Sequence, residues 1–302
     1  MRFSLITPVY NRADYIRDCI QSVVDQMDNF TDFEHIIVDD GSTDNTLEII
    51  RLYEKRCGFI KTISYEKNAG VNYARNRGIE KACGEFIIFL DSDDTLNSGI
   101  LRTINEAILE DLHYNHFFFR VSSNKIENVS KREIGFKELL LEAVEGDFLH
   151  VVRASFLKEQ LFFEQFRAFE VLNWLRVVQK TQPVLDIPIQ AVSVRIGDND
   201  SLSQRTYKST NRNVLIENFK AKRMYLDMYG DELKKYSVKA FYKKVLLLFL
   251  TGARADLYAA NTSLIKELTP YSSLQKVFLI FFNNRAFSFL VRKAYSFKYF
   301  IE

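Results

Sequence analysis

The first 94 residues alternate between short strand-like runs and stretches of helical periodicity, and this alternation narrows the fold more than any other feature. The strand-like runs cover 3–7, 35–38, 59–64 and 86–90. Between them, apolar side chains recur at helical spacing over 15–24, 47–52 and 68–82. Because strands joined through helices pair in parallel and are covered on both faces, the alternation predicts an α/β fold with a mostly parallel central sheet.

Polar clusters follow three of these runs. They are Pro8-Val9-Tyr10-Asn11, Asp39-Asp40-Gly41-Ser42 and Asp91-Ser92-Asp93-Asp94. Pro8 is expected to end the first strand, and Asn11 to cap the helix that follows. The carboxyl ends of parallel strands meet at one edge of a sheet, where open α/β sheets bind their ligands. We therefore expect these clusters to form one site.

The cluster at 91–94 places three carboxylates within four residues, directly after a buried strand. Such groups repel one another unless a cation or solvent separates them. Hard divalent cations take oxygen ligands, and Mg²⁺ often binds one or two carboxylates together with substrate phosphates. An Asp-x-Asp pair therefore suits a metal bound to a nucleotide diphosphate. The alternative is a purely structural role, in which an Asp-rich turn caps a helix that begins near Asn97.

Two further segments carry polar chemistry with equally simple alternatives. In 39–44, a carboxylate beside Gly41 can accept hydrogen bonds from a base or ribose, or the segment is a capped strand-to-helix turn. In 68–78, Arg75 and Arg77 lie on a helix near the same edge of the sheet. Arginine suits phosphate, although a solvated helix face explains the same charges.

Taken together, in this order and spacing, four segments resemble family 2 glycosyltransferases of the GT-A fold. They are 7–11, 38–44, 68–78 and 84–94. The resemblance is dense over the first 110 residues and thinner over the next 90. It implies an inverting enzyme that transfers a sugar from a UDP-sugar to a glycan acceptor, with UDP as leaving group. A lipid-linked acceptor in bacterial O-antigen, capsule or exopolysaccharide synthesis is expected.

The resemblance also implies roles for matching positions. The implied nucleotide-binding residues are Pro8, Tyr10, Asp40, Asn68, Arg75, Asp91 and Ser92. Of these, the first three would line the pocket of the base, usually uracil, and Asp91 would hold the ribose. Asp93 would bind the cofactor, Mn²⁺ or Mg²⁺, which bridges the diphosphate.

An inverting transferase needs a general base, which in this family is commonly the Asp of a Glu-Asp pair shortly before a Trp on a helix. Here the matching segment contains Phe169-Glu170 and then Trp174, so the pair is absent. Glu170 is the catalytic base that the resemblance implies, since Glu reaches one methylene further than Asp. Glu164 is its nearest rival, and an exposed first-turn helix residue is the structural alternative for Glu170.

After residue 110 the pattern is less regular. Strands are expected at 117–121 and 148–152, a helix at 169–179, a strand with turns at 183–194, and helices from about residue 210. We expect a GT-A domain over 1–205, divided into a nucleotide-binding half (1–110) and an acceptor-binding half (111–205). A basic helical region would follow over 206–302.

Charge is unevenly distributed along the chain. The net charge is +2, but residues 201–302 carry +11 and residues 1–200 carry −9. The stretch 274–300 mixes phenylalanines with lysines and arginines, a composition that favours anionic membrane surfaces. The alternative is that these helices pack on the catalytic domain or form a homodimer. Nucleic acid is not expected as a partner, because no recognition motif accompanies the charge.

Cysteine usage and hydropathy indicate the compartment. Three widely spaced cysteines argue against a disulfide scaffold or a zinc site. The first residues turn polar too soon for a secretory signal, and no apolar run reaches the ~18 residues that span a bilayer. We expect a cytoplasmic protein, peripheral on the cytoplasmic face of the inner membrane.

Two other functions fit parts of the sequence. A nucleotidyltransferase uses a similar sheet and metal, but its glycine-rich loop is absent after Thr7. A catalytically degenerate, membrane-bound scaffold is favoured by the missing Glu-Asp pair and disfavoured by Asp91 and Asp93. Over 195–203 the resemblance implies a loop that closes over the diphosphate. Arg195, Arg205 and Lys208 are candidate phosphate contacts there, and solvated surface charge is the favoured alternative for each. His113 and His116 are interpreted as strand-edge residues, since no second ligand pair accompanies them.

Overall fold

The structure of the protein is a computed structural model. It describes residues 1–121, 130–144, 146–166, 169–194, 209, 211–255 and 257. The chain divides into two compact units, Met1–Asp198 and Asn199–Glu302. The boundary expected at residue 205 lies outside the described residues.

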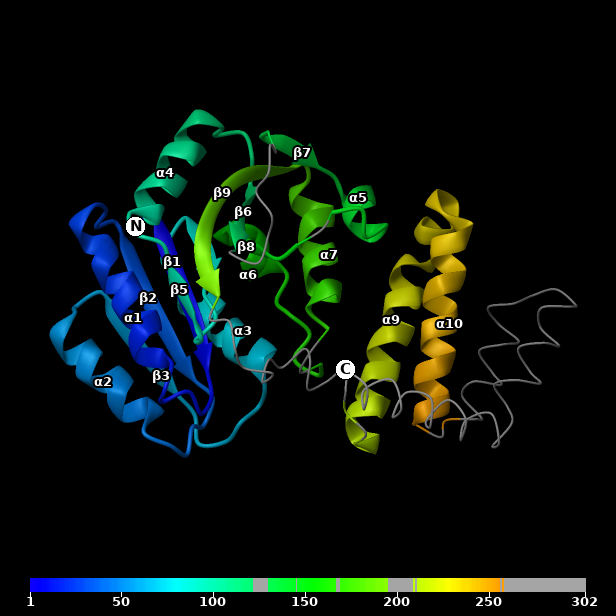
Figure 1. Cartoon of the computed structure of the whole chain (residues 1–302), viewed down its shortest axis with the longest axis horizontal. Coiled ribbons are helices and arrows are strands. Elements are labelled where there is room, and N and C mark those ends of the chain that lie inside the picture. The colour runs from blue at the N-terminus through cyan, green and yellow to red at the C-terminus, as the bar shows by residue number, and fades with distance from the viewer. Residues whose placement is uncertain are drawn as a thin grey trace, which may run out of the picture. The chain divides into compact units, whose positions relative to one another are not determined.

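The first unit opens with the predicted alternation of strands and helices (Figure 1). Its first four strands are β1 (Phe3–Val9), β2 (Phe33–Asp39), β3 (Ile60–Ser64) and β4 (Phe86–Phe89). They lie in the order β3-β2-β1-β4 and pair in parallel, as predicted. The connections are α1 (Ile16–Val24) with the short 3₁₀ helix η1 (Asp25–Asp28), then α2 (Thr46–Arg56) and α3 (Val71–Lys81).

The rest of the unit extends this sheet beyond β4. The added strands are β5 (Asp94–Leu96), β6 (His116–Val121), β7 (Arg132–Ile134), β8 (Phe148–Arg153) and β9 (Val184–Val194). The added helices are α4 (Ile100–Glu110), α5 (Phe136–Leu140), α6 (Ala154–Glu159) and α7 (Glu170–Thr181). Strand β8 is antiparallel to both β4 and β6, whereas β6 and β9 are parallel. The region expected to be a strand with turns is one long strand, β9.

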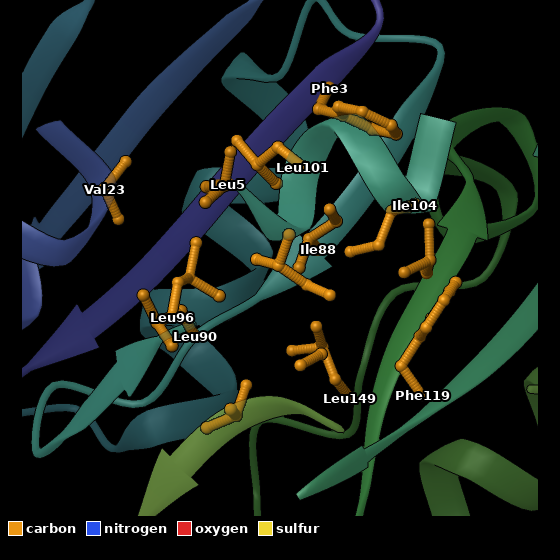
Figure 2. Packing of buried hydrophobic residues seen from close by; sticks show 14 of the residues in the cluster. Phe3, Leu5, Val23, Ile88, Leu90, Leu96, Leu101, Ile104, Phe119 and Leu149 are labelled. Carbon is orange, nitrogen blue, oxygen red and sulfur yellow. The ribbon is translucent and has the colours of Figure 1, made fainter. Parts of the chain in front are cut away.

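Each face of the sheet is covered by its own helices, because neighbouring residues of a strand point to opposite faces. Leu5 of β1 packs in a cluster with residues of α1 and α4, and Figure 2 shows Leu101 and Ile104 of α4 in this cluster with Ile88 of β4. Ile6 belongs to the opposite cluster, with residues of α3, α6 and α7. The fold is therefore an α/β fold, in which a sheet of parallel and antiparallel strands lies between two layers of helices.

Two local expectations at the end of β1 are wrong. Pro8 does not end the strand, because β1 continues to Val9 and Pro8 lies opposite Val38 of β2. Asn11 does not cap α1, which begins at Ile16 after Tyr15. Asn11 instead has a positive φ of 50° and accepts a hydrogen bond from the backbone N–H of Thr43 at 2.8 Å. Its side chain thus ties the loop after β1 to the loop after β2.

In the described part of the second unit, the helices α9 (Arg212–Tyr236) and α10 (Val238–Arg254) lie side by side (Figure 1). Ser237 joins them and caps α10 by accepting a hydrogen bond from the backbone N–H of Ala240. Leu226 and Leu233 of α9 are buried, as are Val245 and Phe249 of α10. The expected helical character is confirmed up to Arg254. Among the described residues, no helix is both long and apolar enough to span a membrane.

Candidate functional site

The loops after β1, β2 and β3 come together at the carboxyl edge of the sheet. Tyr10 is exposed just beyond β1, whereas Pro8 is buried within it. Gly41, with a φ of 78°, lies against the backbone of Lys67 and Asn68, where an added Cβ would meet backbone atoms at 2.9 Å. Glycine is therefore required for this close approach. It brings the half-exposed Asn68 beside the loop after β2.

Asp40 holds the loop after β3 in place at this edge. Its side chain is buried, and its two carboxylate oxygens accept hydrogen bonds from the backbone N–H groups of Ala69 and Gly70 at 2.9 and 2.7 Å. These bonds fix the entry into α3, which begins at the next residue. A contact between Asp40 and a nucleotide base stays a prediction.

The carboxylates after β4 face different surroundings. Asp91 and Asp93 have side chains that are 54% and 40% exposed, whereas Ser92 between them is buried. Asp94 begins β5 and pairs with Val194 of β9. Burial, helped by the negative charges of Asp91, Asp93 and Asp147, raises the pKa of Asp94 to about 8. The edge thus carries an excess of negative charge, with two carboxylates that reach solvent.

Arg75 of α3 links this edge to a distant part of the chain. Its buried guanidinium donates to Asp91 Oδ1 at 3.0 Å and to Glu170 Oε1 at 2.6 Å. Burial by itself would lower the pKa of Arg75, but the charges of Glu170 and Asp91 outweigh it and raise the pKa above its usual value. The predicted phosphate ligand is therefore paired with two carboxylates in this structure.

The two candidate bases have separate partners. Glu170 is the first residue of α7, and Arg75 connects it directly to Asp91. Glu164 Oε1 instead accepts from Asn76 Nδ2 at 2.9 Å and from Arg77 Nη2 at 2.8 Å. Only Glu170, of these two, shares a partner with the strand-end carboxylates. The geometry therefore favours Glu170 over Glu164 as a group in the site.

The donor set at 91–94 fits a hard divalent cation. Its accessible ligands are carboxylate oxygens, and Arg12 Nε lies at the long distance of 3.8 Å from Asp93 Oδ2. No three His, Cys, Asp or Glu side chains form a ready metal-binding group within the described part of the chain. Mg²⁺-type sites often use one or two protein carboxylates and take their other ligands from substrate phosphates and water. One accessible carboxylate at Asp93 is compatible with that arrangement.

A buried cluster of aromatic and histidine side chains, which no sequence pattern predicted, lies beside this site. Trp174 lies one helical turn after Glu170 and stacks on His150 of β8, with ring centroids 3.5 Å apart. His150 Nδ1 lies 3.0 Å from His116 Nε2, and His116 is fully buried. His116 is the first residue of β6, as expected of a residue at the edge of a strand, but it is buried because β6 lies between β8 and β9 in the sheet. Only the pairing of β6 with β8 brings these histidines together.

The family model of glycosyl transferase family 2 matches residues 4–164, more than half of the chain. This chain belongs to glycosyl transferase family 2. An uncharacterized glycosyltransferase of Haemophilus influenzae is 36% identical over 215 residues, which cover 68% of this chain and 83% of that protein. Membership of this family disfavours the nucleotidyltransferase alternative.

Two further family 2 relatives show how far the similarity extends. GalNAc(5)-diNAcBac-PP-undecaprenol beta-1,3-glucosyltransferase of Campylobacter jejuni is 29% identical over 255 residues, covering 80% of this chain and 81% of that protein. The putative teichuronic acid biosynthesis glycosyltransferase TuaG of Bacillus subtilis is 44% identical over 107 residues. That match covers only 35% of this chain and 42% of TuaG, less than half the length of that relative.

Solved structures agree with the GT-A fold. The crystal structure of Staphylococcus aureus TarS 1–349 has a TM-score of 0.61 at 19% identity, and covers 98% of this chain and 91% of that chain. The complex of TarS 1–349 with UDP-GlcNAc has a TM-score of 0.60 at 21% identity, and covers 88% of this chain and 81% of that chain.

Two regions singled out in the sequence lie outside the described residues. They are the loop with Arg195, Arg205 and Lys208, and the stretch 274–300.

Proposed function

We propose that this family 2 glycosyltransferase transfers a sugar from a UDP-sugar to a hydroxyl of a glycan acceptor, with inversion at the anomeric carbon. One observation carries the proposal: Arg75 brings Glu170, a base candidate 95 residues away in sequence, to the carboxylates at the end of β4. Transfer to a hydroxyl by single displacement requires a general base next to the place where the nucleotide and the metal bind. Family membership supplies the reaction class.

Glu170 acts as the general base in this proposal. Arg75 holds its Oε1, whereas no hydrogen bond to Oε2 is found among the described residues. Oε2 then takes the proton of the acceptor hydroxyl as that oxygen attacks the anomeric carbon opposite the diphosphate. The bond from the anomeric carbon to UDP breaks with its electron pair on the departing phosphate oxygen. Arg75 acts as a positioning residue that fixes the carboxylate of Glu170.

The nucleotide and the metal occupy the opposite side of the site in this proposal. Tyr10, Asp40 and Asn68 lie on loops that meet at the edge of the sheet, where the base would bind. Asp91 would accept hydrogen bonds from the ribose. Asp93 would hold Mn²⁺ or Mg²⁺, and a bound divalent cation offsets the charge that develops on a diphosphate leaving group.

The names of the relatives suggest the class of acceptor. The relative from Campylobacter jejuni acts on an undecaprenol-linked glycan, and TuaG is assigned to teichuronic acid biosynthesis. We infer a lipid-linked or polymeric glycan acceptor in bacterial surface polysaccharide synthesis. Such an acceptor would place the protein at the cytoplasmic face of the membrane.

Binding of a UDP-sugar tests the proposal directly. We expect one member of a panel to raise the melting temperature in Mn²⁺, because a ligand at 100 times its Kd stabilises the native state by about 2.7 kcal/mol. The panel contains UDP-glucose, UDP-galactose and their N-acetyl forms, with GDP-mannose as the control. Hydrolysis of the stabilising UDP-sugar should follow. If that sugar binds but is never cleaved or transferred, the protein is the degenerate scaffold instead.

Membrane association is a separate proposal, based on the net charge of +11 over residues 201–302. Each Lys or Arg near an anionic surface contributes about 1 kcal/mol. We expect the protein to sediment with phosphatidylglycerol vesicles at low salt and to be partly released at high salt. Phosphatidylcholine vesicles are the control. Equal sedimentation with both vesicles would contradict the electrostatic attraction, and a stable dimer that ignores vesicles would favour the packing alternative.

A further inference from the structure

The cluster of His116, His150 and Trp174 contains an oriented chain of hydrogen bonds that the proposed chemistry does not use. Thr181 Oγ1 donates to the carbonyl oxygen of Val177 at 3.0 Å and lies 3.1 Å from His116 Nδ1. A hydroxyl has one proton to donate. With that proton directed to Val177, Thr181 accepts from His116, and the proton of His116 then resides on Nδ1.

His116 in turn fixes the tautomer of His150. Burial lowers the pKa of His116 to about 3, so the ring is neutral and its Nε2 has a lone pair. The Nδ1 of His150, 3.0 Å from that nitrogen, must then be the donor. Burial, together with His116 and Arg75, also lowers the pKa of His150. The neutral ring of His150 therefore presents Nε2 as an acceptor.

His150 lies at the edge of the proposed site. In the antiparallel register of β4 and β8, Ile88 is opposite Val151, so Phe89 and His150 are the next neighbours. Phe89 lies under the guanidinium of Arg75, and Trp174, which stacks on His150, lies one turn from Glu170. Unlike His116, His150 is partly exposed. Its Nε2 is not a buried atom left without a partner among the described residues, so it is open to a hydrogen bond from outside the protein.

We propose that His150 Nε2 accepts a hydrogen bond from a sugar hydroxyl in the reaction site and so helps to select the sugar. This inference rests on the proposed function, because it places a sugar between Arg75, Glu170 and Trp174. The hydroxyl belongs either to the donor sugar or to the acceptor glycan. Thr181 and His116 are positioning residues that fix the tautomer of His150.

His150 serves binding rather than proton transfer. A general base works best when its pKa lies near the operating pH, and the lowered pKa makes His150 a weak base. A hydrogen-bond acceptor, in contrast, needs only to remain unprotonated, which the buried network ensures at neutral pH. The contribution of His150 should therefore be constant between pH 6 and 8.

Two amide substitutions separate this role from a structural one. In His150→Asn the amide can still donate to His116, but nothing replaces Nε2. In His150→Gln the longer side chain brings a carbonyl oxygen close to the position of Nε2. We expect His150→Asn to lower kcat/KM about 10-fold, in line with the loss of one hydrogen bond, and His150→Gln to recover most of it. His113→Asn, at an exposed histidine outside the network, is the matched control.

Two assays identify the source of the hydroxyl. The first measures hydrolysis of the UDP-sugar chosen by the panel, and the second measures its transfer to a lipid extract of the producing organism. A fall in both rates assigns the hydroxyl to the donor, and a fall in transfer alone assigns it to the acceptor. UDP affinity should stay unchanged in every variant. Equal rates in His150→Asn and the wild type, or equal losses in the Asn and Gln variants, would overturn the inference, whereas an inactive wild type would overturn the proposed function instead.

Discussion

Replacing Glu170 by Gln should lower kcat by about 100-fold or more, the range expected when a general base is lost, while the affinity for UDP stays unchanged. Gln is nearly isosteric and retains an oxygen that can accept the hydrogen bond from Arg75. Unlike the carboxylate, it cannot take a proton at neutral pH. The measurement is the rate of sugar transfer at saturating donor, together with UDP binding by calorimetry.

Glu164→Gln is the matched control for this prediction, because it makes the same chemical change six residues earlier. Its Oε1 accepts from Asn76 and Arg77, away from Asp91. We expect this variant to retain most of the wild-type rate. If Glu164→Gln is the inactive variant and Glu170→Gln is not, the assignment of the base is wrong.

Replacing Asp93 by Ala should abolish most metal-dependent turnover. A catalytic metal stabilises developing charge by several kcal/mol, so losing its protein ligand should cost about 100-fold or more in rate. The affinity for the UDP-sugar should fall sharply in Mn²⁺ and change little in EDTA. A titration of activity against Mn²⁺ in wild type and variant measures this difference.

Asp28→Ala controls for the change in net charge, since it removes an exposed acid of η1. We expect the Mn²⁺ dependence of this variant to match the wild type. Should Asp93→Ala also retain its full rate and its Mn²⁺ response, Asp93 does not hold a metal. The role of Glu170 would keep its own test, because the two substitutions remove different groups of the site.

Several features of the site could be predicted because they depend on short stretches of chain. The apolar runs at β1, β2, β3 and β4 specify buried strands, and the polar residues after them lie at the carboxyl edge through the geometry of a parallel sheet. The start of α7 at Glu170 follows from local helical periodicity. These signals also carried the resemblance to the family, which the family model confirmed.

Errors arose where a local rule competed with a contact from elsewhere in the chain. Asn11 is a good helix cap by residue type, yet its side chain binds the backbone of Thr43 in the next loop. The alternative for the acids at 91–94, a turn that caps a helix near Asn97, fails in the same way, because Asp94 begins a strand that pairs with β9. In both cases the partner lies tens of residues away.

The sequence by itself determined the order of the first four strands and the helices between them, the edge of the sheet at which the polar clusters lie and the identity of the acidic groups there. Only the tertiary structure decided which of them meet. Arg75 reaches Glu170 across 95 residues, and His116 reaches His150 because β8 is antiparallel to both β4 and β6. Local periodicity indicates whether a side chain faces the core, but it does not indicate which strand pairs with which, or in which direction. The pairing of distant strands is what turns separate polar residues into one site.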